Sequence, residues 1–430
     1  MTASLIGIAA LCLLGFLGFP LGFTMVAVGF VGFGLVRAWG PALETVGQTV
    51  LDLSMNSEFS ALPLFVLMGA FIHRSKISDD LYRAAHAWFC HLRGGLAMAT
   101  VLACGGLAAV TGSSLATTAM MARVAMPPMQ RYGYANSLAA GSIASGGTLG
   151  MLIPPSTSLL IYGVLTNQHI GKLFIAGIVP GLALMALFVL AIAIVTWLRP
   201  EVAKIAPPVG AAERWRATAR VWPVLALFFG ILGGIYFGVF TPSESGGIGA
   251  TGALAFAWFR GTLDRKVFFE ALVEAGRTTA MLFAVGFGAL VVNNFVTVAG
   301  MTGELVAWVN SLEVAPVVVV IVLGLLYLLL GTVFDGIALI LLTVPIFFPV
   351  VAALGYDLIW FGIFVVIMAE ISVISPPVGM NVFVMRSLYP ELSLWEVFNG
   401  TWPFFFAALF LAGLIIAFPG IVLWLPGMMK

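Results

Sequence analysis

The chain has 430 residues, of which 61% are hydrophobic and 9% charged, and its formal net charge is +1. Because soluble proteins average about 25% charged residues, we expect most of this chain to lie in a membrane, in contact with lipid. The small net charge and the absence of a basic stripe with interleaved aromatic residues exclude nucleic acid as a partner.

Apolar segments long enough to cross a bilayer predict ten membrane spans. They cover residues 3–18, 20–37, 61–73, 136–163, 172–198, 221–240, 246–262, 280–299, 358–386 and 401–427. Two further apolar pairs, 94–111 with 114–130 and 315–332 with 338–351, are each interrupted by a short Gly/Ser/Asp segment. We interpret each pair as a re-entrant helical hairpin, which returns to the side of the membrane from which it entered. The predicted fold is an all-α polytopic membrane protein.

The distribution of basic residues predicts the topology. With the N-terminus outside, 16 of the 19 Lys and Arg fall on the cytoplasmic side, and only Arg37, Lys172 and Lys430 lie outside. This bias follows the positive-inside rule and would be lost if either hairpin were a full span. Both termini are then expected on the outer side. The charged segment 199–220 is the predicted linker between two halves. Four segments combine charged and apolar residues at helical spacing, and they are predicted as helices along the membrane surface, at 41–60, 76–92, 263–279 and 302–313.

An internal repeat relates the two halves. Gly133-Tyr134 and Gly355-Tyr356 are 222 positions apart, and each glycine is followed 21 residues later by a diproline, Pro154-Pro155 or Pro376-Pro377. Paired units of this kind are common in transporters. Under the predicted topology the second unit starts from the opposite side of the membrane, so we expect inverted repeats, each with a hairpin and a discontinuous helix. The predicted divisions are scaffold helices at 1–60, the first unit at 61–165, a helix and cytoplasmic linker at 166–220, scaffold helices at 221–282, the second unit at 283–387 and a C-terminal helix at 388–430.

The first predicted hairpin tip is polar. Thr111-Gly112-Ser113-Ser114 offers hydroxyl and carbonyl oxygens but no charge. Irregular backbone at membrane depth survives only where protein, water or ions complete its bonding, and oxygen ligands suit a hard cation such as sodium. Opposite this tip, Gly146-Gly147-Thr148 and Gly150 precede Pro154-Pro155, which predicts a broken helix whose ends present dipoles to ligands. The alternative for Ser113 and Ser114 is that they cap helix ends.

The second unit carries two acids at matching places. Asp335-Gly336 occupies its tip, and Glu370, Ser372 and Ser375 precede the diproline. An ionised carboxylate at bilayer depth is costly unless it is paired or bound to a cation. Both acids are therefore candidates for a functional site. The alternative for each is a protonated or hydrogen-bonded carboxyl group with a structural role.

Three other polar positions are candidates for the solute path. Asn293-Asn294 lies near the middle of a span and could line the path or bridge helices, while Asn381 follows the second diproline. Arg386 lies near the inner end of the second broken helix, where it could meet an anionic solute or extend to the membrane surface.

Motifs of other protein classes are missing or misplaced. Gly247-x-Gly249-x-x-Gly252 has the letters of a dinucleotide fingerprint, but it lies in an apolar span and predicts helix packing. No P-loop is present, and the four histidines fall in surface segments, where none can act as a base for Ser113. The three cysteines form no CxxC motif, so neither a disulfide framework nor a zinc site is indicated. We therefore expect no enzyme and no cofactor.

Several long motifs resemble the large membrane subunit of TRAP transporters, and the resemblance covers nearly the whole chain. The motifs are Gly112-Ser113-Ser114, residues 144–156, Gly177-Ile178-Val179-Pro180-Gly181, Phe334-Asp335-Gly336 and residues 376–383. The chain is also similar, more distantly, to sodium-coupled dicarboxylate symporters with paired hairpins.

The resemblance implies an elevator-type, sodium-driven importer of a small organic anion in the bacterial inner membrane. Its implied partners are a periplasmic solute-binding protein and a separate small four-helix membrane subunit. The sodium-binding positions that match the family are Ser113, Ser114, Gly147, Thr148, Asp335, Gly336, Ser372, Ser375 and Pro376. The family more often has Gly and Thr where Ser372 and Ser375 stand, so only backbone ligation is expected to carry over there.

A solute site is expected around the same tips. Its predicted residues are Gly112, Ser156, Asn293, Asn294, Asn381 and Arg386. The alternatives to this function are a membrane component of an ATP-driven importer and a passive channel.

Overall fold

The computed structural model describes residues 2–75, 77–332 and 334–429, and these residues form α-helices and short 3-10 helices with no β-strand. The all-α prediction is therefore confirmed. Lys76 and Lys430, two of the basic residues behind the predicted topology, lie outside the described residues.

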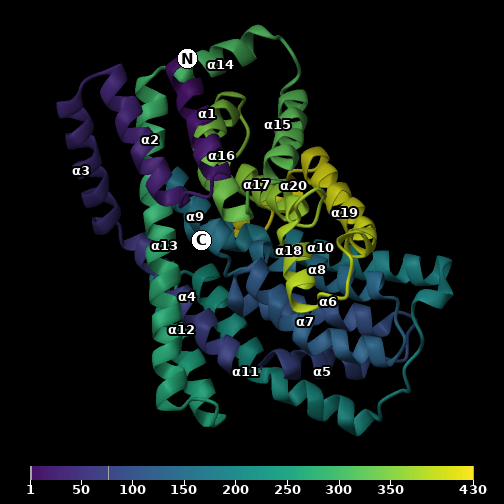
Figure 1. Cartoon of the computed structure of the whole chain (residues 1–430). Helices are drawn as coiled ribbons and strands as arrows, with labels where there is room; N and C mark the ends of the chain where they lie inside the picture. The colour runs from purple at the N-terminus through teal and green to yellow at the C-terminus, as the bar shows by residue number, and fades with distance from the viewer. Residues whose placement is uncertain (1, 76, 333, 430) are drawn as a thin grey trace.

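The helices of the first half begin with three at the N-terminus and continue into the first repeated unit (Figure 1). They are α1 (Thr2–Phe16), α2 (Leu21–Val36), α3 (Trp39–Met55), η1 (Ser57–Ser60), α4 (Ala61–Arg74), α5 (Ile77–Phe89), α6 (Gly95–Thr111), α7 (Ser114–Arg131), α8 (Asn136–Leu152), α9 (Thr157–Thr166), α10 (Ile170–Leu198) and η2 (Pro200–Val202).

Two helices lead from the linker into the second half. The remaining elements are α11 (Ala211–Tyr236), α12 (Pro242–Phe259), α13 (Arg265–Val298), α14 (Met301–Ser311), α15 (Pro316–Gly331), α16 (Gly336–Ala353), α17 (Leu358–Ser372), α18 (Met380–Leu388), α19 (Leu394–Ala417), α20 (Gly420–Leu423) and η3 (Pro426–Met428).

Both predicted hairpins form as pairs of contacting helices. Only Gly112 and Ser113 separate α6 from α7, while α15 ends at Gly331 and α16 begins at Gly336. Helix α8 packs against both arms of the first pair, and α17 packs in the same way against both arms of the second. The expected helix boundaries at the two tips are thus confirmed.

Both predicted broken helices are also present. The span predicted at 136–163 is interrupted between α8 and α9, and the one predicted at 358–386 is interrupted between α17 and α18. Each interruption contains the diproline, because proline has no N–H to donate to the helix ladder. Each half-helix that follows packs on the other unit's hairpin: α9 contacts α16, and α18 contacts α7.

Two boundary predictions were wrong. The surface helix expected at 263–279 and the span expected at 280–299 are one continuous helix, α13, of 34 residues. Asp264 caps this helix by accepting a bond of 2.6 Å from Val267 N–H, and no proline interrupts it. The linker expected to reach residue 220 ends earlier, because α11 begins at Ala211, where alanine, glutamate and arginine favour helix.

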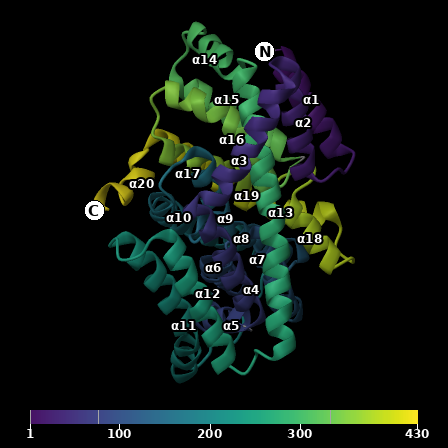
Figure 2. The same ribbon diagram turned by 90° about the vertical axis from the view of Figure 1, so that its left-hand side faces the viewer.

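Among the residues that the structure describes, six helical segments are long and apolar enough to cross a membrane: Asn136–Thr166, Ile170–Leu198, Ala211–Tyr236, Arg265–Val298, Gly336–Ala353 and Leu394–Ala417. Several of the other predicted spans are shorter apolar helices, including α1 and α2. Helix α13 runs along the length of the molecule in both views, with α5 at one end and α14 at the other (Figures 1 and 2). Hairpin α6–α7 lies in the half with α5, and hairpin α15–α16 lies in the half with α14.

Candidate functional site

The two hairpin tips, which are more than 200 positions apart in the chain, line one cavity. Its lining residues are Gly112, Ser113, Ser114, Leu115, Met151, Thr157, Ser158, Asp335, Gly336, Ile337, Val373, Met380 and Asn381. About 40 Å³ of the cavity can hold the centre of a water molecule. Because one bound water needs about 10–15 Å³ of such volume, this space suits a few waters or ions.

Four helices begin at this cavity. Ser114, Thr157, Gly336 and Met380 are the first residues of α7, α9, α16 and α18, and all four line it. A helix N-terminus carries unpaired N–H groups and about half a positive charge. None of the described lining residues is Lys, Arg or His. The positive partial charges at this cavity therefore come from backbone, which suits an anion, while Asp335 supplies the one acidic side chain among the described lining residues.

Gly112 fastens the first tip to the break between α8 and α9. Its carbonyl oxygen accepts a hydrogen bond of 2.8 Å from the Thr157 hydroxyl group. Its φ is +59°, and a Cβ at this position would lie 2.6 Å from the carbonyl oxygen of Pro155. Both the left-handed backbone and the close approach require glycine. Gly112 lines the cavity, and its role in solute binding stays a prediction.

Ser113 and Ser114 have different partners. The Ser113 hydroxyl group accepts from Ala116 N–H at 3.5 Å, which makes Ser113 the N-cap of α7. The side-chain amide of Asn381 donates to the Ser114 hydroxyl oxygen and to the Ala144 carbonyl oxygen, both at 2.8 Å. Asn381 is fully buried. It therefore ties α18 of the second unit to α7 and α8 of the first.

Asp335 caps the second hairpin arm. Its Oδ1 accepts from Ala338 N–H at 3.0 Å, so the carboxylate lies at the N-terminus of α16. No salt bridge joins Asp335 to a basic side chain within the ranges that the structure describes. Gly336 follows it against the Met151 side chain. An acid in this position can balance the charge of a bound cation while its second oxygen remains available.

Glu370 lies outside the cavity. It is 1% exposed, and neither carboxylate oxygen has a hydrogen-bond partner among the described residues. The backbone of Leu152, at the end of α8, lies beside it, but hydrogen-bond geometry is not met. Glu370 is thus an isolated acid between α17 and the break that follows α8.

The other predicted sodium-binding residues are close to the tips but do not line the cavity. Gly147 packs against the Thr118 side chain, and the Thr148 hydroxyl group donates to Ser145 O at 2.8 Å. Ser372 packs against Gly331 at the end of α15. The hydroxyl groups of Ser372 and Ser375 bond within their own segment, to Ala369 O at 2.7 Å and Ser372 O at 3.1 Å. Pro376 follows them in the interruption before α18.

Four predicted solute-binding residues also lie outside the cavity. Ser156 is buried and caps α9, accepting from Leu159 N–H at 3.3 Å. Asn294 donates to the Thr49 hydroxyl group at 3.2 Å and so bridges α13 to α3. Asn293 is half-buried on α13, and Arg386 is exposed in the last turn of α18.

Sequence reasoning missed two hydroxyl residues that line the cavity, Thr157 and Ser158. Ser158 is fully buried, and its Oγ has no hydrogen-bond partner among the described residues. The run Ser156-Thr157-Ser158 directly after the first diproline was the signal that could have identified them. The buried hydroxyl groups of Thr118 and Ser145 also lack partners in the described part of the chain. Such oxygens are ligands that a hard cation prefers.

Comparison with known families decides what kind of protein carries this site. Residues 8–421 match the family model of the tripartite ATP-independent periplasmic transporter, DctM component. The chain belongs to this family. The resemblance drawn from the sequence motifs is therefore confirmed, and this DctM-family protein is a membrane transport protein and not an enzyme.

Known relatives agree with the family assignment. The chain is 35% identical over 389 residues to the C4-dicarboxylate TRAP transporter large permease protein DctM of Pseudomonas aeruginosa, covering 90% of each chain. It is 29% identical to the ectoine TRAP transporter large permease protein TeaC of Halomonas elongata, covering 99% of this chain and 98% of the relative.

A solved structure gives the same fold at low sequence identity. The crystal structure of the Alcanivorax borkumensis YdaH transporter matches with a TM-score of 0.66 at 14% identity, covering 97% of this chain and 98% of that one. At this identity the likeness shows the fold alone. The description of the DctM family as ATP-independent contradicts the alternative of an ATP-driven importer.

Proposed function

We propose that this DctM-family permease is the solute-translocating subunit of a sodium-coupled importer for a small organic anion. The observation that carries the proposal is the convergence of four helix N-termini on a cavity shared by both hairpin tips. Backbone dipoles attract an anion without a fixed basic side chain. A solute held this way is released more readily than one paired with a buried arginine, as a transport cycle requires.

Sodium coupling is supported by the oxygen atoms around the tips. Asp335 provides a carboxylate, and Ser158, Thr118 and Ser145 provide buried hydroxyl groups without described partners. Sodium ions bound beside the tips would satisfy these oxygens and add positive charge next to an anionic solute. In this proposal neither ligand binds well without the other, and that mutual dependence couples uptake to the sodium gradient.

The identity of the solute class rests on chemistry and on relatives. The Pseudomonas relative is named for C4-dicarboxylates and the Halomonas relative for ectoine, and both kinds of solute carry a carboxylate group. A carboxylate fits the N-terminal ends of α7, α9, α16 and α18. The present cavity is too small for such a solute, so we infer that the tips separate to admit it.

The family also supports the proposed assembly. Its description as tripartite and periplasmic agrees with a periplasmic binding protein and a small four-helix membrane subunit as partners in the inner membrane. Within the chain, α5 and α14 hold equivalent places in the two units and lie at opposite ends of the molecule (Figure 2). This supports inverted repeats, with the two hairpin units moving together against a scaffold that includes α2 and α12.

The test uses the full transporter with its partners in proteoliposomes. We expect solute uptake to require an inward sodium gradient, and Asp335→Asn to raise the sodium concentration needed for half-maximal uptake by tenfold or more. Asparagine caps helices about as well as aspartate, so the change removes the charge and keeps the cap. Asp357→Asn is the matched control, because Asp357 caps α17 by accepting from Ile359 N–H at 2.8 Å and does not line the cavity.

Two results would reject sodium coupling at the tips. One is equal uptake with and without the gradient, which a passive channel predicts. The other is an equal sodium response in Asp335→Asn, Asp357→Asn and the unmodified protein.

A further inference from the structure

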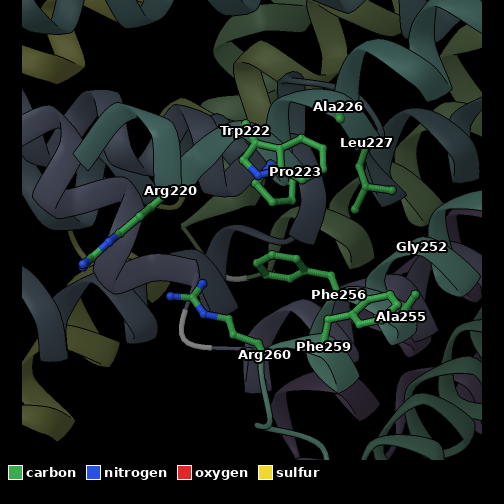
Figure 3. Close-up of a pocket in the computed structure, with 10 residues that line it drawn as sticks. All are labelled: Arg220, Trp222, Pro223, Ala226, Leu227, Gly252, Ala255, Phe256, Phe259 and Arg260. Atoms are coloured by element: carbon green, nitrogen blue, oxygen red, sulfur yellow. The ribbon is translucent and has the colours of Figure 1, made fainter. Parts of the chain in front are cut away.

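A groove of about 780 Å³ lies between α11 and α12, apart from the transport cavity (Figure 3). Residues 220–227 of α11 form one wall, and residues 252–260 at the end of α12 form the other. The volume falls in the range of about 300–1,000 Å³ that is typical of small-molecule sites. No part of the proposed transport mechanism uses this groove.

The groove is apolar over most of its length. Trp222, Phe256 and Phe259 supply aromatic walls, while Gly252 and Ala255 leave room between the two helices (Figure 3). Trp222 is 65% exposed and Phe259 is 86% exposed. In a membrane protein such side chains face lipid, so the groove is open to a hydrocarbon chain along its side.

One end of the groove is basic. The guanidinium groups of Arg220 and Arg260 lie toward the same end in Figure 3. Arg260 lies over the Phe256 ring at 5.4 Å and pairs with Asp80 of α5, which fixes its orientation. Arg220 has no acidic side chain within salt-bridge distance in the described ranges. The Arg260–Asp80 pair is neutral overall, so Arg220 gives this end its net positive charge.

This basic end has the composition of a membrane surface. Arg214 and Arg216 precede Arg220 on α11, and Trp215 and Trp258 are 66% and 69% exposed. Exposed tryptophans mark the level of lipid headgroups, and basic residues mark the cytoplasmic side. The groove therefore runs from the headgroup region, at its arginines, into the hydrocarbon region.

We propose that this groove binds an anionic glycerophospholipid, such as phosphatidylglycerol. The phosphodiester group accepts hydrogen bonds from Arg220 and from the donors of Arg260 that Asp80 does not use. One acyl chain lies along Trp222, Phe256 and Phe259. A zwitterionic lipid fits the apolar part equally well, but its cationic headgroup is repelled by the free charge of Arg220.

The experiment uses the full chain in detergent, with phosphatidylglycerol and phosphatidylcholine of identical acyl chains as probes in native mass spectrometry. We expect phosphatidylglycerol to bind more tightly. Arg220→Gln should weaken its binding about fivefold, the effect of one basic residue at a lipid surface. Arg131→Gln is the matched control, since Arg131 is an exposed arginine at the end of α7, outside the groove.

A second variant tests the apolar part. Ala226→Trp fills the groove from its exposed α11 wall without changing charge, and it should weaken the binding of both lipids. The proposal is overturned if the two lipids bind the unmodified chain equally, or if Arg220→Gln and Arg131→Gln have the same effect. It is also overturned if Ala226→Trp leaves the binding of both lipids unchanged.

A photo-crosslinker at position 226 in the complete transporter identifies the occupant in membranes. Crosslinks to phospholipid support the proposal. Crosslinks to the small membrane subunit would overturn it in favour of a protein interface. Both results are independent of solute uptake, so the proposed transport function and the lipid site can fail separately.

Discussion

The contact between Ser114 of the first repeated unit and Asn381 of the second gives a prediction about how the two units stabilise each other. Asn381→Ala removes three buried hydrogen bonds: its amide donates to the Ser114 hydroxyl and the Ala144 carbonyl oxygens, and its Oδ1 accepts from the Ser114 hydroxyl group at 3.1 Å. We expect this change to lower the stability of the folded chain. Ser114→Ala removes the two of these bonds that involve its hydroxyl group and should have a smaller effect.

The expected size follows from the partners. A buried hydrogen bond contributes about 0.5–1.5 kcal/mol net, so the three bonds of Asn381 contribute at most about 1.5–4.5 kcal/mol. The space left by the amide in a fully buried site adds to this loss. We therefore expect about 2–4 kcal/mol for Asn381→Ala and about 1 kcal/mol for Ser114→Ala. Because both changes remove the two hydrogen bonds that Ser114 and Asn381 share, the double variant should lose less than the sum, by about 0.5 kcal/mol or more.

Denaturant or thermal unfolding of the full chain in detergent measures these differences. Ser387→Ala is the control partner for Asn381, because its hydroxyl group bonds only within α18, to Val384 O at 2.8 Å. The stability losses of Asn381→Ala and Ser387→Ala should add. If the Ser114 and Asn381 changes also add within about 0.3 kcal/mol, the inferred bond between the units does not stabilise the protein and the reasoning is refuted.

Three further predictions concern the surroundings of the tips, and each is tested by the melting temperature of the full chain. Gly112→Ala should lower it and reduce uptake, because a φ of +59° costs an L-residue about 1–2 kcal/mol and the Pro155 carbonyl oxygen cannot move aside; an unchanged melting temperature would contradict this. Glu370→Ala should lower it more than Glu370→Gln, since glutamine keeps the volume of a side chain whose oxygens have no described partner; equal losses would count against that view. Gly147→Ala should lower the melting temperature, because the added Cβ lies closest to the Thr118 hydroxyl oxygen. Adding Thr118→Ala removes that oxygen and should restore part of the melting temperature. If the melting temperature does not recover, a contact with Thr118 is not the cause of the loss.

The tips and the helix breaks were predictable because their signals are local. Gly112 interrupts an apolar run at a position where only glycine is compatible with the backbone. Pro154 and Pro155 are two consecutive residues without a backbone N–H, so the helix is interrupted there. The all-α class followed from composition in the same way. Each of these features depends on residues that are neighbours in the chain, so the sequence alone contains the information.

Other features depend on residues that are distant in the chain. Ser114 was predicted as a sodium ligand or a cap, but its partner Asn381 is 267 positions away, and no periodicity indicates such a pairing. Ser158 lines the cavity on α9, a helix that packs against α16 of the other unit. The continuity of α13 was missed because its charged first turns resemble a surface helix, whereas tertiary packing against α4 and α2 extends it.

The exchange of half-helices between the two units has a consequence for biogenesis. Helix α7 is synthesised long before α18, which supplies its partner Asn381, 267 positions after Ser114. At about 5–20 residues per second, translation of that interval takes on the order of tens of seconds. During this time the nascent first half is in the bilayer with surfaces on α7 and α9 that only later helices can cover. A chain truncated in the linker would keep those surfaces exposed and become a substrate for membrane quality control.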